Sequence, residues 1–423
     1  MKARFGRGAR RKRWIKWNEM WRLLNSAMAA IAGSAVQALV PKDEKAIVVL
    51  YLPLRNAGGF SDNAKYLYLY LVNELAWQRV TYITTSQETV TCLETEGYRA
   101  RLWFSWGGLW ELMRAGTVYG THVHSFRMIR GYVTKNARTI QMWHGVGVKQ
   151  NVGMLNKKYK GGGRLIERMT WALERRFTPV DYTCFASQDQ IMQRKEMVPH
   201  RNALINGQPK AEALVRYNPI GWDDIGGDRP VLDELRRARS TGKRVLLMAL
   251  TWRRGVKRSG GAETFVHWAH LNDVARRMGV IVCVKRHPIV GDGVRFVGYS
   301  NLLTYNAHAC VTPLLRETDI LVTDYSSIFS DFYLLRRPAI FFNPDYKDAV
   351  EGGDVAEQFV MDPPGLATFT FDELVQSIQD ESYNSARCRR QREDWLERAN
   401  EGGVMGACER LAHLARRGEV PAG

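Results

Sequence analysis

Short runs of apolar and β-branched residues alternate along the chain with longer amphipathic stretches. Alternation of this kind is typical of βαβ units, in which helices join parallel strands. The pattern therefore predicts an α/β protein built on parallel sheets. The predicted strands are residues 46–52, 79–85, 138–143 and 182–187 in the first half, and 244–250, 280–285, 319–323 and 339–342 in the second.

A segment rich in Gly, Pro and Asp, NPIGWDDIGGDRP at 218–230, separates the two groups of strands and has the composition of a linker. A chain of 423 residues is also too long for one ordinary hydrophobic core. We therefore predict two Rossmann-like domains that face a cleft, residues 43–215 and 216–383. An Arg- and Glu-rich helical segment, 384–423, follows them.

The first 42 residues have a different composition from the rest. The chain carries a formal net charge of +18, and the residues before Glu19 supply 8 of those charges. The segment 23–40 is uncharged, rich in Ala and at the short limit for a membrane-spanning helix. Tryptophans interleaved with basic residues are typical of a helix that lies on an anionic membrane. We predict such an interfacial helix over 1–42, the alternative being a solvated basic tail that leads into a packed helix; its membrane-contacting residues are Arg11, Arg13, Trp14, Trp17 and Trp21.

Several kinds of site are disfavoured. The six cysteines are scattered without a CxxC pair, which predicts buried or free thiols in a reducing compartment. His122 and His124 are two residues apart, so on a strand both side chains would lie on the same face and could bind one metal ion. No neighbouring carboxylate or cysteine completes a set of metal ligands, so no metal is predicted. There is no GxxxxGK[ST] motif and no GxGxxG after a strand, which argues against P-loop enzymes and dinucleotide dehydrogenases. No cofactor is expected.

Polar, cationic or imidazole groups follow four of the predicted strands. In open α/β sheets, ligands bind beyond the carboxyl ends of the strands. The coincidence at several strand ends therefore indicates a ligand site. The groups are His144 after 138–143, Thr251 to Arg254 after 244–250, KRHP (285–288) after 280–285, and DYSSIFSD (324–331) after 319–323.

The last of these groups has features of a phosphate site. Ser326 or Ser327 is expected to cap a helix that runs on through FSDFYLLRR (329–337), and helix N-termini bind phosphate. Asp331 would accept a hydrogen bond from a ribose hydroxyl or position a donor. Lys285, Arg286 and the two arginines at 253–254 add cations that suit a pyrophosphate. Taken alone, a serine cap without any ligand is the more common explanation of these serines.

Two of the nine histidines stand out by position. His144 precedes Gly145, so one side of its imidazole is open to approach, as a general base requires. His287 is preceded by two cations, which should depress its basicity and favour a neutral donor toward phosphate.

With these residues identified, the chain resembles the CDP-glycerol glycerophosphotransferases of teichoic-acid and capsule synthesis. The resemblance rests on the order and spacing of seven motifs across most of residues 46–380. They are FSDNAKYLYLYL (60–71), QMWHGVGVKQ (141–150), LINGQPKAEAL (204–214), ALTWRRG (249–255), KRHP (285–288), TDYSSIFSDFYLLRRPAIFF (323–342) and EQFVMDPPG (357–365).

The resemblance implies a monotopic, membrane-associated transferase of the two-domain GT-B type. The N-terminal domain would take the acceptor and the C-terminal domain the CDP-linked donor. His144 and His287 match the essential histidine pair, and Ser326, Ser327 and Asp331 match the segment that holds the nucleotide diphosphate. Thr251 and Arg253 look like a further phosphate contact. The family often reads WHGTPLKxxG where this chain reads WHGVGVKQNVG, a departure that bears on the acceptor preference. Leu250 replaces a usual proline before the segment with Thr251 and Arg253.

The expected reaction transfers glycerol phosphate from CDP-glycerol to a hydroxyl of a membrane-linked or polymeric acceptor and releases CMP. It would take place at the cytoplasmic face of the membrane. A CDP-ribitol ribitolphosphotransferase and a sugar-nucleotide glycosyltransferase on the same scaffold are the nearest alternatives. A non-enzymatic polyanion- or nucleic-acid-binding protein would explain the charge but not the residues at the strand ends, so no nucleic-acid partner is expected.

Overall fold

The computed structural model describes most of the chain outside the N-terminal segment. Arg253, His287 and the five membrane-contacting residues predicted between Arg11 and Trp21 lie outside the described residues. The described residues are 39–53, 59–129, 133, 137–146, 180–194, 200–216, 224–251, 261–286, 296–351 and 355–417.

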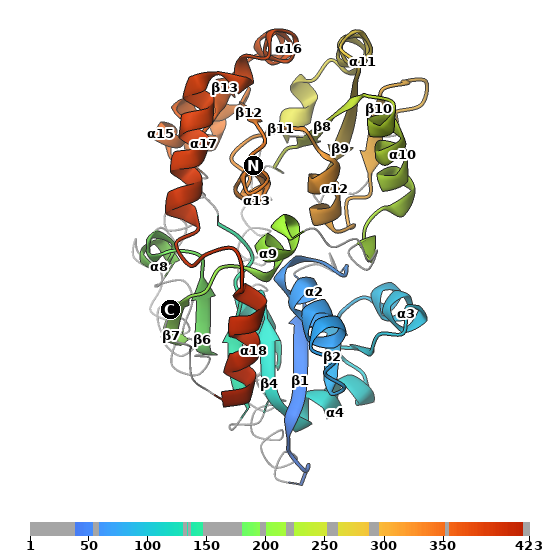
Figure 1. Ribbon diagram of the computed structural model, residues 1–423, viewed down its shortest axis with the longest axis vertical. Coiled ribbons are helices and arrows are strands. Elements are labelled where there is room, and N and C mark those ends of the chain that lie inside the picture. The colour runs from blue at the N-terminus through green and yellow to red at the C-terminus, as the bar shows by residue number, and fades with distance from the viewer. Residues whose placement is uncertain are drawn as a thin grey trace, which may run out of the picture.

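Two separate parallel sheets organise the structure, one in each half of the molecule (Figure 1). The first sheet has seven strands in the order β3-β2-β1-β4-β5-β6-β7. Every pairing between its described strands is parallel. The strands are β1 Asp43–Tyr51, β2 Val80–Thr84, β3 Ala100–Leu102, β4 Ala115–Gly120, β5 Arg138–Gln141, β6 Val180–Phe185 and β7 His200–Ile205.

The second sheet has six strands in the order β10-β9-β8-β11-β12-β13, again paired in parallel. The central strands of such sheets are buried on both faces, which explains their continuous apolar runs. The strands are β8 Arg244–Ala249, β9 Val280–Lys285, β10 Leu302–Tyr305, β11 Ile320–Thr323, β12 Ala339–Phe342 and β13 Leu366–Thr368.

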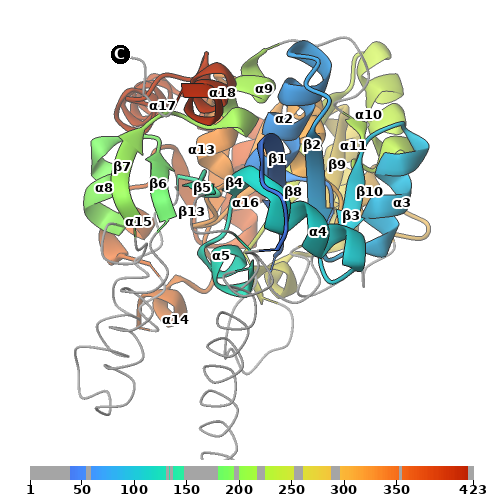
Figure 2. The ribbon, with the colours of Figure 1, turned by 90° about the horizontal axis from the view of Figure 1, so that it is seen from below.

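Helices cover both faces of each sheet. Viewed from below, α2 and α18 lie on one face of the first sheet and α4 and α5 on the other (Figure 2). In the second half, α11 and α16 pack on one face and α10, α12, α13 and α17 on the other. The helices of the first half are α2 Asp62–Leu69, which continues as the π-helix η2 Tyr70–Glu74, α3 Gln87–Thr95, α4 Trp106–Arg114, α5 Val123–Ile129, α8 Gln188–Arg194 and α9 Pro209–Val215.

The remaining helices belong to the second half and the C-terminal segment. Local capping fixes several helix starts: Thr370 and Glu373 form a capping box at α16, and Ser385 accepts a hydrogen bond from Cys388 at the start of α17. These helices are α10 Arg229–Ser240, the 3-10 helix η5 Gly261–Phe265, α11 Trp268–Arg277, α12 Val311–Glu317, α13 Ile328–Tyr333, α14 Tyr346–Glu351, α15 Glu357–Met361, α16 Phe371–Asp380, the 3-10 helix η6 Ser382–Asn384, α17 Ala386–Ala399 and α18 Ala407–Arg417.

The C-terminal segment connects the two halves. It consists of two helices separated at a turn that contains Gly403 and Gly406, both with positive φ. The first, α17, packs through Trp395 and Leu396 on the core of the second sheet. The second, α18, contributes Leu411 to the core of the first sheet, where the carbonyl of Leu411 accepts a hydrogen bond from the hydroxyl of Tyr119. The described chain thus returns to the half that contains the first sheet.

All eight predicted strands are present, with ends shifted by three residues at most. The sequence missed β4 and the four edge strands β3, β7, β10 and β13. Edge strands are covered on fewer sides, so they carry no continuous apolar run; β7, for example, is largely exposed. All six cysteines fall among the described residues and are free thiols, five of them buried, as predicted.

Candidate active site

The loops that leave the carboxyl ends of β5 and β11 meet at the boundary between the two halves. Ser330 on α13 donates from Oγ to the carbonyl of Val146, at 2.9 Å. A Cβ built on Gly145 would lie 3.5 Å from the Oγ of Ser327. The segment with His144 and the segment with Ser326, Ser327 and Asp331 therefore lie side by side, as the sequence predicts.

Four consecutive carbonyl groups of the loop 143–146 accept hydrogen bonds from side chains. Each donor comes from a different helix: Asn63 Nδ2 binds the carbonyl of residue 143 at 2.9 Å and Lys210 Nζ binds that of residue 144 at 3.0 Å. Gln190 Nε2 binds the carbonyl of residue 145 at 2.8 Å, and Ser330 binds that of residue 146. The backbone of this loop is therefore fixed from several directions.

The conformation of the loop needs this support. Trp143 has φ of 58°, in the left-handed region that costs a non-glycine residue roughly 1 kcal/mol or more. Gly145 has φ of 154°, which side-chain-bearing residues rarely adopt. Backbone strain held in place by its surroundings is common at functional sites. Here it accompanies a turn that leaves the side chain of His144 exposed.

The imidazole of His144 lies against a second histidine. The rings of His144 and His122 are stacked, with centroids 5.1 Å apart and planes 12° from parallel. His122 Nδ1 is 2.8 Å from the Oγ1 of Thr121, and Tyr51 packs edge-on to its ring. The sequence pattern suggests a role for His122 only as a metal ligand, and it does not predict the position of His122 beside His144.

A buried group of charges lies directly beneath this loop. Lys210 Nζ is 2.8 Å from Asp331 Oδ2 and 3.8 Å from Asp62 Oδ1, and the three side chains are 11%, 16% and 13% exposed. Burial raises the pKa of Asp62 to about 6, although Lys210 and the backbone N–H of Asn63 act in the opposite direction. Burial lowers the pKa of Lys210, but the carboxylates of Asp331 and Asp62 outweigh it, so the pKa is raised. Lys210 is therefore a charged ammonium group.

Asp324 organises the second-sheet side of the site. Its carboxylate is fully buried and accepts hydrogen bonds from the N–H and Oγ1 of Thr251, both at 2.7 Å, and from the N–H of Ser326 at 3.0 Å. The hydroxyl group of Thr251 therefore donates its hydrogen to Asp324. Asp324 joins the end of β8 to the turn after β11, which keeps the two strand ends in register.

The predicted serine cap is wrong in its detail. Ser327 occupies the N-cap position of α13, but its hydroxyl makes no capping hydrogen bond, because the residue has helical rather than extended backbone angles. The helix is also shorter than predicted and ends at Tyr333, since Arg336 has a positive φ and Pro338 follows. Ser326 and Ser327 are both partly exposed.

The cations predicted at the end of β9 are bound to protein groups. Lys285 Nζ donates to the carbonyl groups of Asn306 and Ala307, at 3.1 Å and 2.8 Å. Arg286 is buried and pairs through Nε with Glu263, at 2.8 Å. Both side chains are thus held in place by their neighbours beside the strand end that precedes His287.

The structure therefore brings His144, Ser327 and Asp331 together, and links Thr251 to Ser326 through Asp324. Lys285 and Arg286 lie at a strand end of the same sheet. The residues that sequence reasoning missed are those that hold this arrangement. Four of them, Asn63, Lys210, Asp324 and Ser330, lie within motifs that carry the family resemblance (60–71, 204–214 and 323–342), which was the available signal. The fifth, Gln190, lies outside these motifs.

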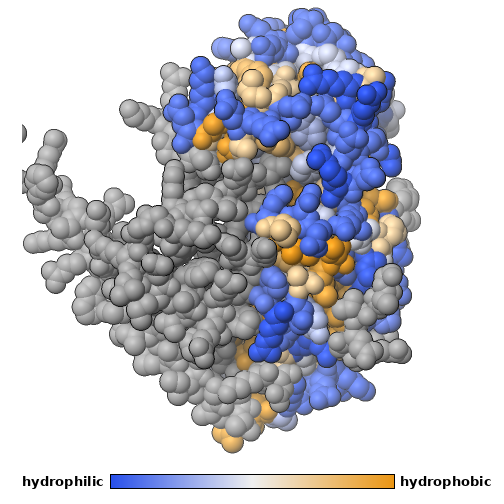
Figure 3. Space-filling model, turned by 90° about the vertical axis from the view of Figure 1, so that its left-hand side faces the viewer, coloured by the Kyte–Doolittle hydropathy of each residue, from blue (hydrophilic) through white to orange (hydrophobic). Residues whose placement is uncertain are grey.

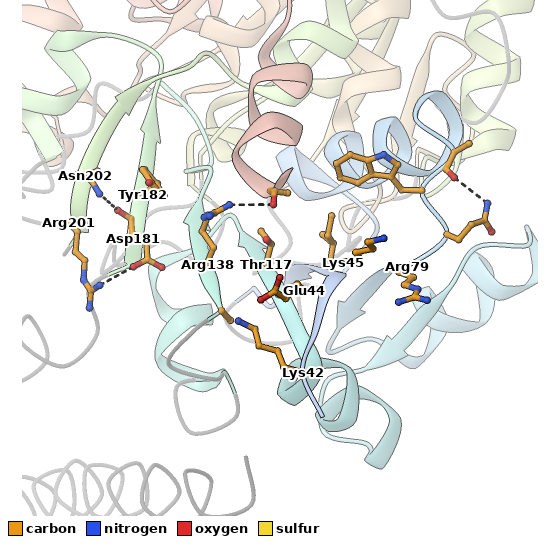
Figure 4. Close-up of a pocket in the computed structure, with 17 residues that line it drawn as sticks. Lys42, Glu44, Lys45, Arg79, Thr117, Arg138, Asp181, Tyr182, Arg201 and Asn202 are labelled. Carbon is orange, nitrogen blue, oxygen red and sulfur yellow. Dashed lines mark hydrogen bonds and ion pairs between the residues drawn. The ribbon is translucent and has the colours of Figure 1, made fainter. Parts of the chain in front are cut away.

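A cavity lies at the opposite end of the first sheet, where its strands begin. This cavity of about 980 Å³ contains none of the predicted site residues (Figure 4). Two of its basic residues are bound to protein groups: Arg201 pairs with Asp181, and Arg138 donates to the carbonyl of Leu414. The charged residues that line it are Lys42, Glu44, Lys45, Arg79, Arg138, Asp181 and Arg201.

The described part of the chain holds neither a metal-binding cluster nor a helix able to span a membrane. No three His, Cys, Asp or Glu side chains in this part of the chain are grouped to hold a metal ion. None of the described helices combines the length and apolar character needed to cross a bilayer. Consistent with this, hydrophilic residues cover much of the described surface on the side of the molecule shown in Figure 3.

Two parallel sheets flanked by helices, with strand-end loops that meet at one polar site, define an α/β protein of two Rossmann-like halves. Residues 34–413 match the family described as CDP-Glycerol:Poly(glycerophosphate) glycerophosphotransferase. The chain belongs to this family.

Individual relatives agree with this assignment. The chain is 24% identical over 249 residues to the teichoic acid ribitol-phosphate polymerase TarK of Staphylococcus aureus, covering 58% of this chain and 46% of the relative. It is 25% identical over 271 residues to a teichoic acid poly(glycerol phosphate) polymerase of Staphylococcus epidermidis, covering 58% and 35%. The chain thus spans less than half the length of these relatives.

A solved structure shows the same fold. The wall teichoic acid polymerase TagF superposes with a TM-score of 0.67 at 18% identity, over 95% of this chain and 98% of that one. At this identity the likeness concerns the fold.

Proposed function

We propose that the chain is a glycerophosphotransferase that moves glycerol phosphate from CDP-glycerol to a hydroxyl of a membrane-linked or teichoic-acid-like acceptor and releases CMP. One observation carries the proposal. The loop that bears His144 is held against the segment with Ser327 and Asp331 by contacts from both halves of the molecule. This arrangement brings a candidate base next to a candidate phosphate-holding segment, and membership of the family supports the choice of donor.

In the proposed reaction, the acceptor hydroxyl attacks the phosphorus that bears glycerol. The bond from that phosphorus to the CMP oxygen breaks, and a phosphodiester forms. Such transfers depend on in-line positioning and charge neutralisation more than on covalent catalysis. His144 would take the proton of the attacking hydroxyl, and its exposed ring on a fixed backbone suits that role.

The donor would be held on the second-sheet side. Ser326, Ser327 and Asp331 follow β11, and Thr251 and Arg253 follow the neighbouring strand β8. Lys285 ends the next strand, β9, and is followed by Arg286 and His287. In this proposal His287 and Arg253 oppose the charge that builds on the departing CMP, while Lys285 and Arg286, which are bound to Asn306, Ala307 and Glu263, act from fixed positions without touching it. Thr251 would act through Asp324, to which its hydroxyl is bound.

We further propose the GT-B arrangement, with residues 43–215 on the acceptor side and 216–383 on the donor side. Attachment of the basic N-terminal segment to the cytoplasmic face of an anionic membrane fits this scheme, because the acceptor is expected to be membrane-linked. Sedimentation of the protein with vesicles, with and without an anionic lipid, tests this attachment; equal binding to neutral vesicles would contradict it.

The decisive assay incubates purified protein with membranes and CDP-glycerol, CDP-ribitol or a UDP-sugar, and identifies the nucleotide released. CMP release from CDP-glycerol supports the proposal, and release of UDP instead would indicate glycosyl transfer. His144→Ala should lower kcat by about 10²- to 10⁴-fold, the usual contribution of a general base, while the Kd for CDP-glycerol stays nearly constant. Unchanged turnover in this variant would remove His144 from the mechanism.

A ribitolphosphotransferase is the second candidate. The relative TarK is by its name a ribitol-phosphate polymerase. This chain is 24% identical to TarK and 25% identical to the poly(glycerol phosphate) polymerase, so sequence identity does not distinguish the two donors. Both donors present the same CDP to the residues after β8, β9 and β11. The ratio of CMP release from CDP-glycerol and CDP-ribitol separates the two.

A further inference from the structure

Lys210 occupies an unusual place among the groups that hold the His144 loop. Its ammonium group donates to the carbonyl of His144 at 3.0 Å and to the carboxylate of Asp331 at 2.8 Å. The first partner is on the first-sheet side, and the second is on α13 in the second half. One side chain therefore connects the backbone of the candidate base with the segment proposed to hold the donor phosphates.

The backbone of Lys210 adds a second connection to the same loop. Its N–H donates to Asn63 Oδ1 at 3.0 Å, and Asn63 Nδ2 in turn donates to the carbonyl of Trp143. The main-chain N–H of Lys210 thus fixes Asn63 in the orientation that supports the strained φ of Trp143. Its side chain binds the carbonyl of the next residue, His144, so the main chain and the side chain of Lys210 act on two consecutive residues of the loop.

The position of Lys210 makes these contacts strong. Its side chain is 11% exposed, so water screens the ion pair with Asp331 weakly. Removing one member of a buried pair leaves the other charge without compensation. Asp62 lies 3.8 Å from the same ammonium group, so the loss of Lys210 would leave two carboxylates facing each other without their cation.

We propose that Lys210 is a positioning residue for the transfer reaction, which sets the distance between the imidazole of His144 and the phosphate-holding segment at Ser327 and Asp331. The proposal rests on the proposed function. Lys210 would not touch the substrate, because its ammonium group is committed to protein oxygens. Its effect should therefore appear in turnover rather than in donor affinity.

The test compares Lys210→Met with the wild type. Loss of positioning should lower kcat at least tenfold, whereas the Kd for CDP-glycerol, measured by calorimetry, should change less than threefold. Lys210→Arg retains a cation with several donors and should recover most of the turnover. If Lys210 instead bound the donor phosphates directly, Lys210→Met would raise the Kd for CDP-glycerol and lower kcat/KM together.

A matched control is available in the chain. Arg229 in the second half pairs with Glu96 in the first at 2.9 Å, so it also joins the two halves, but it is 52% exposed. Arg229→Met should leave kcat unchanged. If both variants lose turnover equally, general loosening between the halves is responsible and the positioning role is refuted.

Hydrogen exchange gives a readout that does not depend on activity. The amides of residues 143–146 should exchange faster in Lys210→Met and remain as in the wild type in Arg229→Met. If Lys210→Met does not fold, Ser330→Ala removes a neighbouring contact to the loop and should lower kcat by a smaller factor. Wild-type kcat and unchanged exchange in Lys210→Met would overturn the inference. If the wild type releases no CMP from CDP-glycerol, the proposed function fails, and exchange alone then decides whether Lys210 holds the loop.

Discussion

Asp62 should make the stability of the protein fall as pH rises. It is the first residue of α2, its side chain is 13% exposed, and it lies 3.8 Å from Lys210. Burial raises its pKa from an ordinary value of 3.8 to about 6. The folded protein therefore binds the proton of this carboxyl more tightly than the unfolded chain does.

The size and sign of the effect follow from this difference. Between pH values of about 4 and 6, Asp62 keeps its proton in the folded protein and loses it in the unfolded chain, so the free energy of unfolding decreases as pH rises. About two pKa units correspond to roughly 3 kcal/mol in total. The stabilisation is complete below the unfolded pKa and is lost once the pH exceeds the folded pKa.

Asp62→Asn isolates this contribution. Asn resembles the protonated carboxyl in shape, and like Asp it tolerates the φ of 62° found at this position. Urea unfolding of both proteins at several pH values between 4 and 8 gives the difference in free energy of unfolding, in which all other titrating groups cancel. We expect the variant to gain roughly 3 kcal/mol relative to the wild type across this range.

The outcome that would contradict this prediction is specific. A difference for Asp62→Asn that stays constant between pH 4 and 8, or one that shifts in favour of the wild type as pH rises, would refute the reasoning from burial.

The two remaining predictions concern the second-sheet side of the site. Asp324→Ala removes a buried acceptor of three hydrogen bonds and should lower the free energy of unfolding by about 3 kcal/mol or more, measured by urea denaturation. A loss below about 1 kcal/mol would mean that Thr251 and Ser326 find other partners. Replacing Ser326 and Ser327 together with Ala should weaken the Kd for CDP-glycerol about tenfold by calorimetry, as expected for the loss of about 1.4 kcal/mol of hydrogen bonding. Unchanged affinity would show that these hydroxyls do not hold the donor.

The strands that sequence reasoning found are those buried on both faces. β9 and β12 were predicted to the residue, because an uninterrupted apolar run marks a strand between two helical layers. β4 was missed although it is central, since its sequence AGTVYG includes two glycines. Gly116 is required there: a Cβ at this position would lie 2.3 Å from the carbonyl oxygen of Glu44. Such a close approach of two backbones leaves no pattern in the sequence.

The candidate site was predictable in outline because ligand-binding groups follow the carboxyl ends of parallel strands, and because the two predicted domains face a cleft. His144 follows β5 of the first sheet and the Ser327 segment follows β11 of the second, so strand ends that face each other across the cleft could be expected to bring them near each other. The side chains that fix them could not, because each depends on a long-range pairing: Asn63 contacts residue 143, and Lys210 contacts Asp331 across 121 positions. Which amide or ammonium group reaches which carbonyl is decided by tertiary packing alone.

The return of α18 to the first sheet has a consequence for how the protein is made. Leu411, Ala412 and Leu414 fill part of the interior of the half that is synthesised first. While the ribosome is still translating the second half, the corresponding apolar surface of α2 and the first sheet has no cover. The amino-terminal half should then be unable to reach its final stability during translation, and a nascent chain lacking 407–417 should be a preferred client of chaperones.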